Sequence, residues 1–336
     1  MRRAFLALLL LLLTACQGHG QQTPPLTSER TAYRLVDDKG VVTQQVTDLQ
    51  GPYRARTLTS SNGVPLGGFL WDETGLYAVA ADGSLTQSEY VGPGFPGPAS
   101  HLDLALPVAL RQGLVSTLGP GTVGARACTR WVSLEPLDGA PFGPATTDER
   151  TESCVDPHGV ILSETWTSSG KLIRTRTFVS RGTYRSNPDS LYDGKRPTPL
   201  PTALSEVVVK PSSAAKLAAL LGVPVPAGPP GLKLDRASAV LDVNTDRDGF
   251  SREAAVLTWT GPARLVVLRI ERDLEPGGRT AKGEPVDLGV LGKGRLEPVL
   301  AGLKVTVESG RLRLIATADL PEGELLSWLR SLTLQV

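Results

Sequence analysis

Glycine and proline interrupt this sequence so often that few long helices can form along it. The 336 residues include 36 glycines and 27 prolines, and both residue types end regular elements and favour turns. Between them lie short β-like stretches, such as Tyr33 to Val36 and Leu172 to Val179, and turn signals such as Asn62-Gly63. The sequence therefore predicts a mostly β protein of the α+β class.

The first fifteen residues have the three parts of a bacterial secretion signal. Arg2 and Arg3 precede an apolar run from Ala4 to Leu13, which is about half the roughly 20 residues that a spanning helix needs. Leu13-Thr14-Ala15-Cys16 follows and resembles the bacterial lipobox, whose cysteine becomes the lipidated first residue. Two or more acyl chains anchor a protein stably. We therefore expect Cys16 to attach the chain to a membrane; the alternative is an ordinary secretory signal beside a cysteine.

The rest of the chain divides by composition. Removing residues 1–15 leaves more residues than one core usually holds, so two domains are expected. Residues 16–29 are polar and predict a flexible tether. Residues 30–180 form a first domain, residues 181–203 a linker rich in proline, and residues 204–336 a smaller α+β domain. The expected location is the cell envelope, with the mature chain outside the cytoplasm and the anchor in the outer membrane if the host has one.

Helices are expected at three places. Pro107 to Leu118 is amphipathic and has proline at its start, Ser212 to Leu221 has serine at its cap, and Glu322 to Leu332 places four leucines on one face. The meander from Ala32 to Tyr90 and the strands after residue 238 supply the two sheets. The second domain is thus expected to be an antiparallel sheet with a helix at each end.

Two cysteines remain if Cys16 is lipidated. Cys128 and Cys154 would lie in an oxidising compartment. The sequence has no Cys-x-x-Cys spacing and no histidine cluster beside them, which disfavours a thiol or metal site. A structural disulfide between Cys128 and Cys154 is the prediction.

Residues for catalysis are scarce. His19 falls in the tether, His101 in a loop and His158 in a turn, where an exposed turn residue is the simpler interpretation. The motifs of serine hydrolases, P-loop proteins and zinc proteases are absent from the sequence. We expect no enzyme, no cofactor and no catalytic residue, although a hydrolase site assembled from distant residues stays open.

Neither the charge balance nor the metal-ligating residues of the sequence indicate a specific partner. The 35 basic and 34 acidic residues nearly balance, so nucleic acid is not an expected partner. Asp242 to Gly249 has oxygen-bearing side chains at alternate positions, as calcium loops do. Ala255 stands where a bidentate glutamate would be needed, so a hairpin is favoured over calcium binding, and no metal site is predicted.

Three segments carry a resemblance to a known superfamily. They are Gly121 to Cys128, Cys154 to Leu162, and Gly170 to Arg174. In order and pattern they resemble the LolA/LolB-like lipoprotein carriers, and more closely the RseB/MucB-like two-domain periplasmic regulators of the extracytoplasmic stress sigma factor. The resemblance implies a curved antiparallel half-barrel in the first domain, with covering helices over an apolar cavity that accepts acyl chains. Those regulators are usually soluble, whereas Cys16 would tether this chain.

The resulting functional hypothesis is a non-enzymatic, membrane-tethered envelope lipoprotein. It would bind a lipophilic ligand or the acyl chains of a lipoprotein, as a sensor or regulator, and its partners would be the membrane, that ligand and an envelope protein. The alternative is an interaction or scaffold lipoprotein with filled domains and no ligand. The sequence assigns no individual ligand-binding residue.

Overall fold

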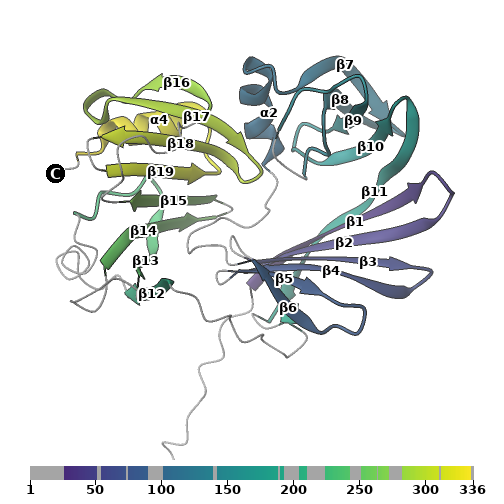
Figure 1. The fold of residues 1–336 in the computed structure, drawn as a ribbon, viewed down its shortest axis with the longest axis horizontal. Helices are drawn as coiled ribbons and strands as arrows, with labels where there is room; N and C mark the ends of the chain where they lie inside the picture. The colour runs from purple at the N-terminus through teal and green to yellow at the C-terminus, as the bar shows by residue number, and fades with distance from the viewer. Residues whose placement is uncertain are drawn as a thin grey trace, which may run out of the picture.

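The mostly β prediction is confirmed by the architecture of the chain. The computed structural model describes residues 26–50, 54–72, 75–89, 101–138, 142–187, 190–192, 204–209, 224–242, 251–262, 264–271, 282–309 and 312–333. Within them the chain forms two antiparallel sheets and two α-helices (Figure 1). None of the helices in this part of the chain has the length and apolar character needed to cross a membrane.

The N-terminal sheet has eleven strands in the order β6-β5-β4-β3-β2-β1-β11-β10-β9-β8-β7. Its first and last strands in sequence, β1 and β11, therefore pair in the middle of the sheet. Figure 1 shows β1–β6 and β7–β10 on two sides of the long strand β11. The strands are β1 (Leu26–Asp37), β2 (Val42–Gln50), β3 (Arg54–Ser61), β4 (Val64–Asp72), β5 (Gly75–Val79), β6 (Leu85–Glu89), β7 (Ser116–Val123), β8 (Arg126–Ser133), β9 (Glu149–Val155), β10 (Ile161–Ser168) and β11 (Lys171–Ser186).

Pairing of β1 with β11 corrects both predicted edges of the first domain. Leu26 pairs with Ser186, so residues 26–29 are strand and not tether, and residues 181–186 are strand and not linker. Each segment looks polar on its own, but the other satisfies its backbone hydrogen bonds. Beyond β11, a 3₁₀ turn at Ser190–Tyr192 buries Leu191 and Tyr192 against Leu70 and Tyr77.

The helix of the N-terminal part begins earlier than predicted. Helix α2 spans Leu102–Arg111 and contains Pro107 in its interior, and the residues from Ser116 onward form β7. A proline inside a helix costs about 3 kcal/mol. Leu102, Leu106 and Ala109 are spaced to share one face and are buried with Ile161 and other apolar residues, and this burial offsets that cost.

The C-terminal sheet has eight strands in the order β12-β13-β14-β15-β19-β18-β17-β16. Helix α4 (Glu322–Ser331) follows the last strand and buries Leu325, Leu326, Trp328 and Leu329, as the leucine spacing predicted. The other predicted helix, Ser212 to Leu221, lies outside the described residues. The strands are β12 (Leu204–Val209), β13 (Lys233–Asp242), β14 (Ser251–Gly261), β15 (Arg264–Glu271), β16 (Glu284–Asp287), β17 (Lys293–Val299), β18 (Gly302–Ser309) and β19 (Leu312–Ala318), with a 3₁₀ turn at Gly289–Leu291.

Helix α2 joins the two sheets. Its Val108 is 1% exposed and belongs to the core of the C-terminal sheet. Arg111 forms ion pairs with Glu284 at 3.2 Å and Glu322 at 2.6 Å, and the Gln112 side chain donates to the Leu296 carbonyl at 2.9 Å. The contact is thus apolar at its centre and polar at its edge.

Candidate functional site

A cavity of about 1070 Å³ lies between the N-terminal sheet and one end of the C-terminal sheet, where residues 261, 264–265, 301 and 317–319 line it. Strands β1 to β3 form its floor, β10 and β11 with the loop before β9 form a wall, and residues near β15 and β19 close one end. Both sheets therefore contribute to one site. Its polar lining residues include Glu29, Thr31, Tyr33, Gln45, Thr47, Thr57, Thr59, His101, Asp138, His158, Arg174, Arg176, Arg181, Arg264 and Asp319.

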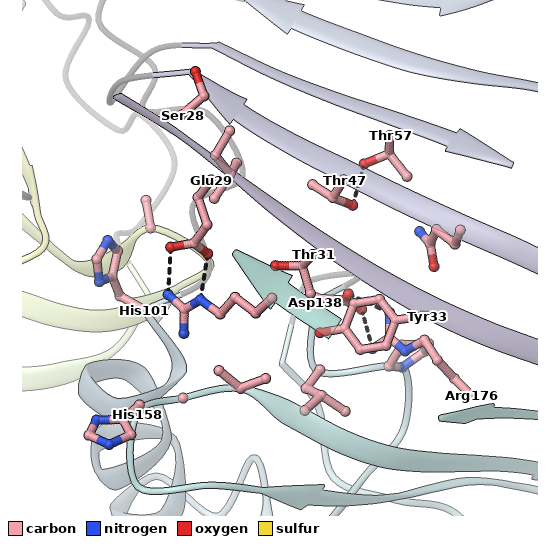
Figure 2. Close-up of a pocket in the computed structure, with 18 of the residues that line it drawn as sticks. Ser28, Glu29, Thr31, Tyr33, Thr47, Thr57, His101, Asp138, His158 and Arg176 are labelled. Carbon is pink, nitrogen blue, oxygen red and sulfur yellow. Dashed lines mark hydrogen bonds and ion pairs between the residues drawn. The ribbon is translucent and has the colours of Figure 1, made fainter. Parts of the chain in front are cut away.

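The floor of the cavity is set by the alternation of side chains along the strands. Apart from Ser28 near the start of β1, the residues of β1, β2 and β3 that line it are odd-numbered, because successive side chains of a strand point to opposite faces. Thr31, Thr47 and Thr57 lie in one cross-strand row, and the hydroxyls of Thr47 and Thr57 are 3.0 Å apart (Figure 2). The next row consists of Tyr33, Gln45 and Thr59.

A bulge in β11 changes which residues of that strand face the cavity. Ala32 pairs with Ser180 and Tyr33 with Phe178, so Val179 has no partner in β1. Before the bulge, even-numbered Arg176 lines the cavity, and after it odd-numbered Arg181 does. An extra residue in one strand re-aims the side chains that follow it, and here it brings two arginines to the same site.

Arg176 is the centre of a buried ion cluster in the wall. Its side chain is 3% exposed, and its Nη atoms lie 2.5 Å from Asp138 and 2.5 Å from Glu164. Glu164 also accepts hydrogen bonds from the Ser153 hydroxyl at 2.6 Å and the Leu137 amide at 3.2 Å. The cluster therefore fixes the loop of residues 134–138 against β9 and β10.

The surroundings of these groups shift their pKa values. Burial raises the pKa of Glu164, against the lowering effect of Arg176. Burial alone would lower the pKa of Arg176, but Asp138 and Glu164 raise it above its ordinary value. Tyr33 lies with its ring centroid 4.8 Å from the Arg176 guanidinium (Figure 2), and burial raises the pKa of Tyr33 to about 12. Tyr33 is thus a neutral hydrogen-bonding group at physiological pH.

The other end of the cavity contains an ion pair and a contact between a histidine and a carboxylate. Arg181 forms two hydrogen bonds to the Glu29 carboxylate, at 2.7 and 2.8 Å. His101, at the start of α2, lies 3.5 Å from Asp319. Burial raises the pKa of Asp319, while the Leu265 amide and His101 lower it. Two units of the chain thus meet here through a histidine and a carboxylate.

The lining of the cavity combines ion pairs with neutral polar groups. In the part of the chain that the structure describes, no three His, Cys, Asp or Glu side chains are grouped so as to hold a metal ion. Arg176 pairs with Asp138 and Glu164, Arg181 pairs with Glu29, and the floor offers neutral hydroxyl and amide groups. Such a cavity can bind a molecule through apolar contacts and hydrogen bonds.

The structure brings some of the predicted residues together and leaves others outside. Cys128 and Cys154, on adjacent strands β8 and β9, form a disulfide with a Cα–Cα distance of 5.5 Å. His158 is exposed in its turn, as predicted, and also lines the cavity. Strands β13 and β14 pair as the hairpin interpretation requires. Cys16 and the loop of residues 243–250 lie outside the described residues.

Sequence reasoning did not find the residues of the ion cluster. Arg174 and Arg176 alternate along a strand-like segment, so both point to one face of it. Glu164 is the second residue after the apolar segment Val160 to Leu162. Charged residues of opposite sign on facing strands were therefore the available signal, but the pairing of β10 with β11 was needed to connect them.

Comparison with known proteins finds only distant similarity to solved structures. No family model matches the sequence, and no curated protein matches it. Among solved structures, the MucA/MucB complex of Pseudomonas aeruginosa is similar with 12% identity and a TM-score of 0.32, over 90% of this chain and 92% of that chain.

Two further structures match about half of the chain. An uncharacterized conserved protein from Thermus thermophilus is 10% identical, with a TM-score of 0.34, over 51% of this chain and 86% of that one. The Mycobacterium tuberculosis lipoprotein LppX is 15% identical, with a TM-score of 0.26, over 53% of this chain and 95% of that one. The function is therefore argued from the cavity itself.

Proposed function

We propose that this chain is a non-enzymatic, membrane-tethered envelope lipoprotein that binds a lipophilic ligand in the cavity between its two sheets. The observation that carries the proposal is the cavity of about 1070 Å³, since binding sites for small molecules measure roughly 300–1,000 Å³. In this proposal the N-terminal sheet acts as a curved half-barrel that closes around the ligand, as the superfamily resemblance implies.

The lining offers an apolar part for such a ligand. Leu35, Val41 and Leu66 line the cavity at the end of β1 farthest from the chain's N-terminus. Val41 and Leu66 are 49% and 55% exposed, so an alkyl chain seated there would remove apolar surface from water, worth about 25 cal/mol per Å². A ligand with an apolar tail therefore fits this end of the cavity.

The anchor and the compartment complete the proposal. Cys16 would carry the lipid and precede β1 by ten residues, which reach at most about 35 Å when extended. The disulfide between Cys128 and Cys154 is of the kind that persists outside the cytoplasm. Because residues at the closed end come from both units, an occupied cavity would hold the two units together, which suits a sensor or regulator.

Native mass spectrometry with lipid extraction tests the proposal. The mature chain, residues 16–336, would be exported with Cys16→Ser so that the anchor cannot be mistaken for a ligand. We expect a stoichiometric lipid adduct that organic solvent removes. A mass equal to that of the bare chain, unchanged after incubation with extracted envelope lipids, would refute ligand binding.

An interaction lipoprotein is the second candidate, and exposed apolar side chains favour it. They lie in or beside the turns of the β1–β2, β3–β4 and β10–β11 hairpins, which are at one end of the sheet (Figure 1). Contiguous exposed apolar surface marks interaction sites. Recovery of an envelope protein without lipid, lost on replacing these residues by serine, would support it. They are Val41, Val64, Leu66, Leu172 and Ile173, which are 44–62% exposed.

A further inference from the structure

A band of neutral polar groups crosses the floor of the cavity. Thr31, Thr47 and Thr57 form one row of it, and Gln45 and Thr59 belong to the next. The Thr47 and Thr57 hydroxyls contact each other. Among the residues described, the side chains of Thr31, Gln45 and Thr59 have no hydrogen-bonding partner within the chain. The band thus retains donors and acceptors that a guest can use.

A plain hydrocarbon guest is a poor match for this band. It would remove water from these hydroxyl and amide groups without replacing the hydrogen bonds, which is unfavourable for each group left unpaired. A guest that brings its own hydrogen-bonding groups avoids this loss. The floor therefore selects for a molecule whose polar part lies in the middle of the cavity.

The cavity lining has no net formal charge that would favour an ionic guest. Four arginines and four acidic residues line the cavity, so their formal charges cancel. Three of the arginines are already paired with carboxylates, which an anionic head would have to displace, and the fourth, Arg174, stacks on the Trp166 ring at the exposed edge of the wall. The pairs are Arg176 with Asp138, Arg181 with Glu29, and Arg264 with Glu324.

We propose that the ligand is an amphiphile with an uncharged, hydroxyl-bearing head, which binds on the threonine and glutamine band while its alkyl tail extends toward Leu35, Val41 and Leu66. This inference rests on the proposed function and specifies the chemical class of its ligand. Tyr33, from the same floor, and Trp166, from the facing wall, place aromatic rings beside the head. Sugar heads and other polyol heads share this chemistry.

Binding of two matched amphiphiles tests the inference. Decyl glucoside and decanoate both have ten-carbon chains. The head of decyl glucoside is uncharged and bears hydroxyls, whereas the head of decanoate is an anionic carboxylate. Calorimetry would measure their dissociation constants below the micellar concentration, on the mature chain with Cys16→Ser. We expect decyl glucoside to bind about tenfold more tightly, which corresponds to about 1.4 kcal/mol.

Variants of the floor link that preference to the band. Thr47→Val together with Thr57→Val removes two hydroxyls and leaves good strand formers. We expect this variant to weaken decyl glucoside about tenfold, with decanoate unchanged. Gln45→Leu tests the band through a different residue and should act in the same direction. Thr177→Val is the matched control, because Thr177 is exposed on β11 and does not line the cavity.

The outcomes separate the inference from the proposed function. Equal affinity for both amphiphiles, or tighter binding of decanoate, would overturn the uncharged-head inference and leave a lipid-binding cavity. An unchanged preference in both the Thr47/Thr57 variant and Gln45→Leu would also overturn it. If neither amphiphile binds, and the exported chain has the mass of the bare protein, the proposed function is refuted and this inference with it.

Discussion

At the scale of single residues, Arg176 has the most consequential environment. A buried ion pair gives little net stability, because removing two charges from water offsets their attraction, but an unpaired buried charge is strongly unfavourable. Here one guanidinium serves two carboxylates and lies against an aromatic ring. The cluster therefore acts mainly to hold the cavity wall in one arrangement.

Replacing Arg176 tests whether the cavity wall depends on this ion cluster. Arg176→Met leaves Glu164, which is buried at 0% exposure, without its cation. We expect the free energy of unfolding to fall by about 3–5 kcal/mol, as measured by guanidinium denaturation. Arg174→Met is the control, since Arg174 is exposed and stacks on Trp166. This variant should lower the free energy of unfolding by less than about 1 kcal/mol. Equal losses in the two variants would contradict a special role for Arg176.

The raised pKa of Tyr33 predicts that the free energy of unfolding depends on pH in the alkaline range. An unfolded tyrosine ionises near pH 10, whereas the pKa of Tyr33 in the folded chain is about 12. Between these values the unfolded chain releases a proton that the folded chain keeps, so stability falls as pH rises, by up to about 1.4 kcal/mol per pH unit. Urea unfolding from pH 9.5 to 11.5 measures this slope. Tyr33→Phe should flatten it, and an identical slope in both proteins would exclude Tyr33 as its source.

Sequence reasoning reached some residues and not others for a physical reason. The Cys128–Cys154 disulfide followed from composition and compartment, which need no knowledge of pairing. The two histidines at the cavity were placed in turns or loops, but their approach to the site depends on distant strands. Glu164 and Arg176 are brought together by strand register, and register cannot be seen in either segment alone.

At the scale of elements, β11 explains most of the differences between expectation and structure. The strand continues to Ser186 because β1 supplies its backbone partners, although its last residues are polar. Likewise α2 begins at Leu102 because burial against the sheet outweighs the local preference for proline at a helix start. Short-range patterns identified the type of most elements, and tertiary contacts moved their ends.

The disulfide gives a prediction at this scale. It joins β8 to β9 across a sequence separation of 26. Closure of a loop of this length is worth about 3.5 kcal/mol in the chain-entropy treatment. The variant with both Cys128→Ser and Cys154→Ser should lose this amount in denaturant unfolding. Addition of a reductant should then destabilise the parent protein and leave the variant unchanged; sensitivity of the variant would contradict the assignment.

At the scale of the molecule, α2 couples the two units. Val108 belongs to the core of the C-terminal sheet, while Leu102 and Leu106 on the same helix belong to a cluster of the N-terminal part. A helix shared in this way should make the two units unfold together. Ligand binding at the cavity, which touches both units, should strengthen that coupling.

The variant Val108→Asp should make the two units unfold separately. An unpaired carboxylate at a site 1% exposed costs several kcal/mol, of the order of 3. We expect the single calorimetric transition to split into two. Leu110→Asp, on the same helix but 39% exposed, should keep one transition. A single transition in Val108→Asp would show that other contacts join the units.

The central pairing of β1 with β11 also dictates when this protein can fold. Leu26 pairs with Ser186, about 160 residues later in the chain. Contacts between residues so distant in sequence form slowly. Until β11 has been added, β1 would present an open edge to any neighbouring strand. A truncation that ends before Lys171 should remain trapped in that state and aggregate. The export that we propose for this chain would therefore require β1 to be shielded until nearly all of the first domain has crossed.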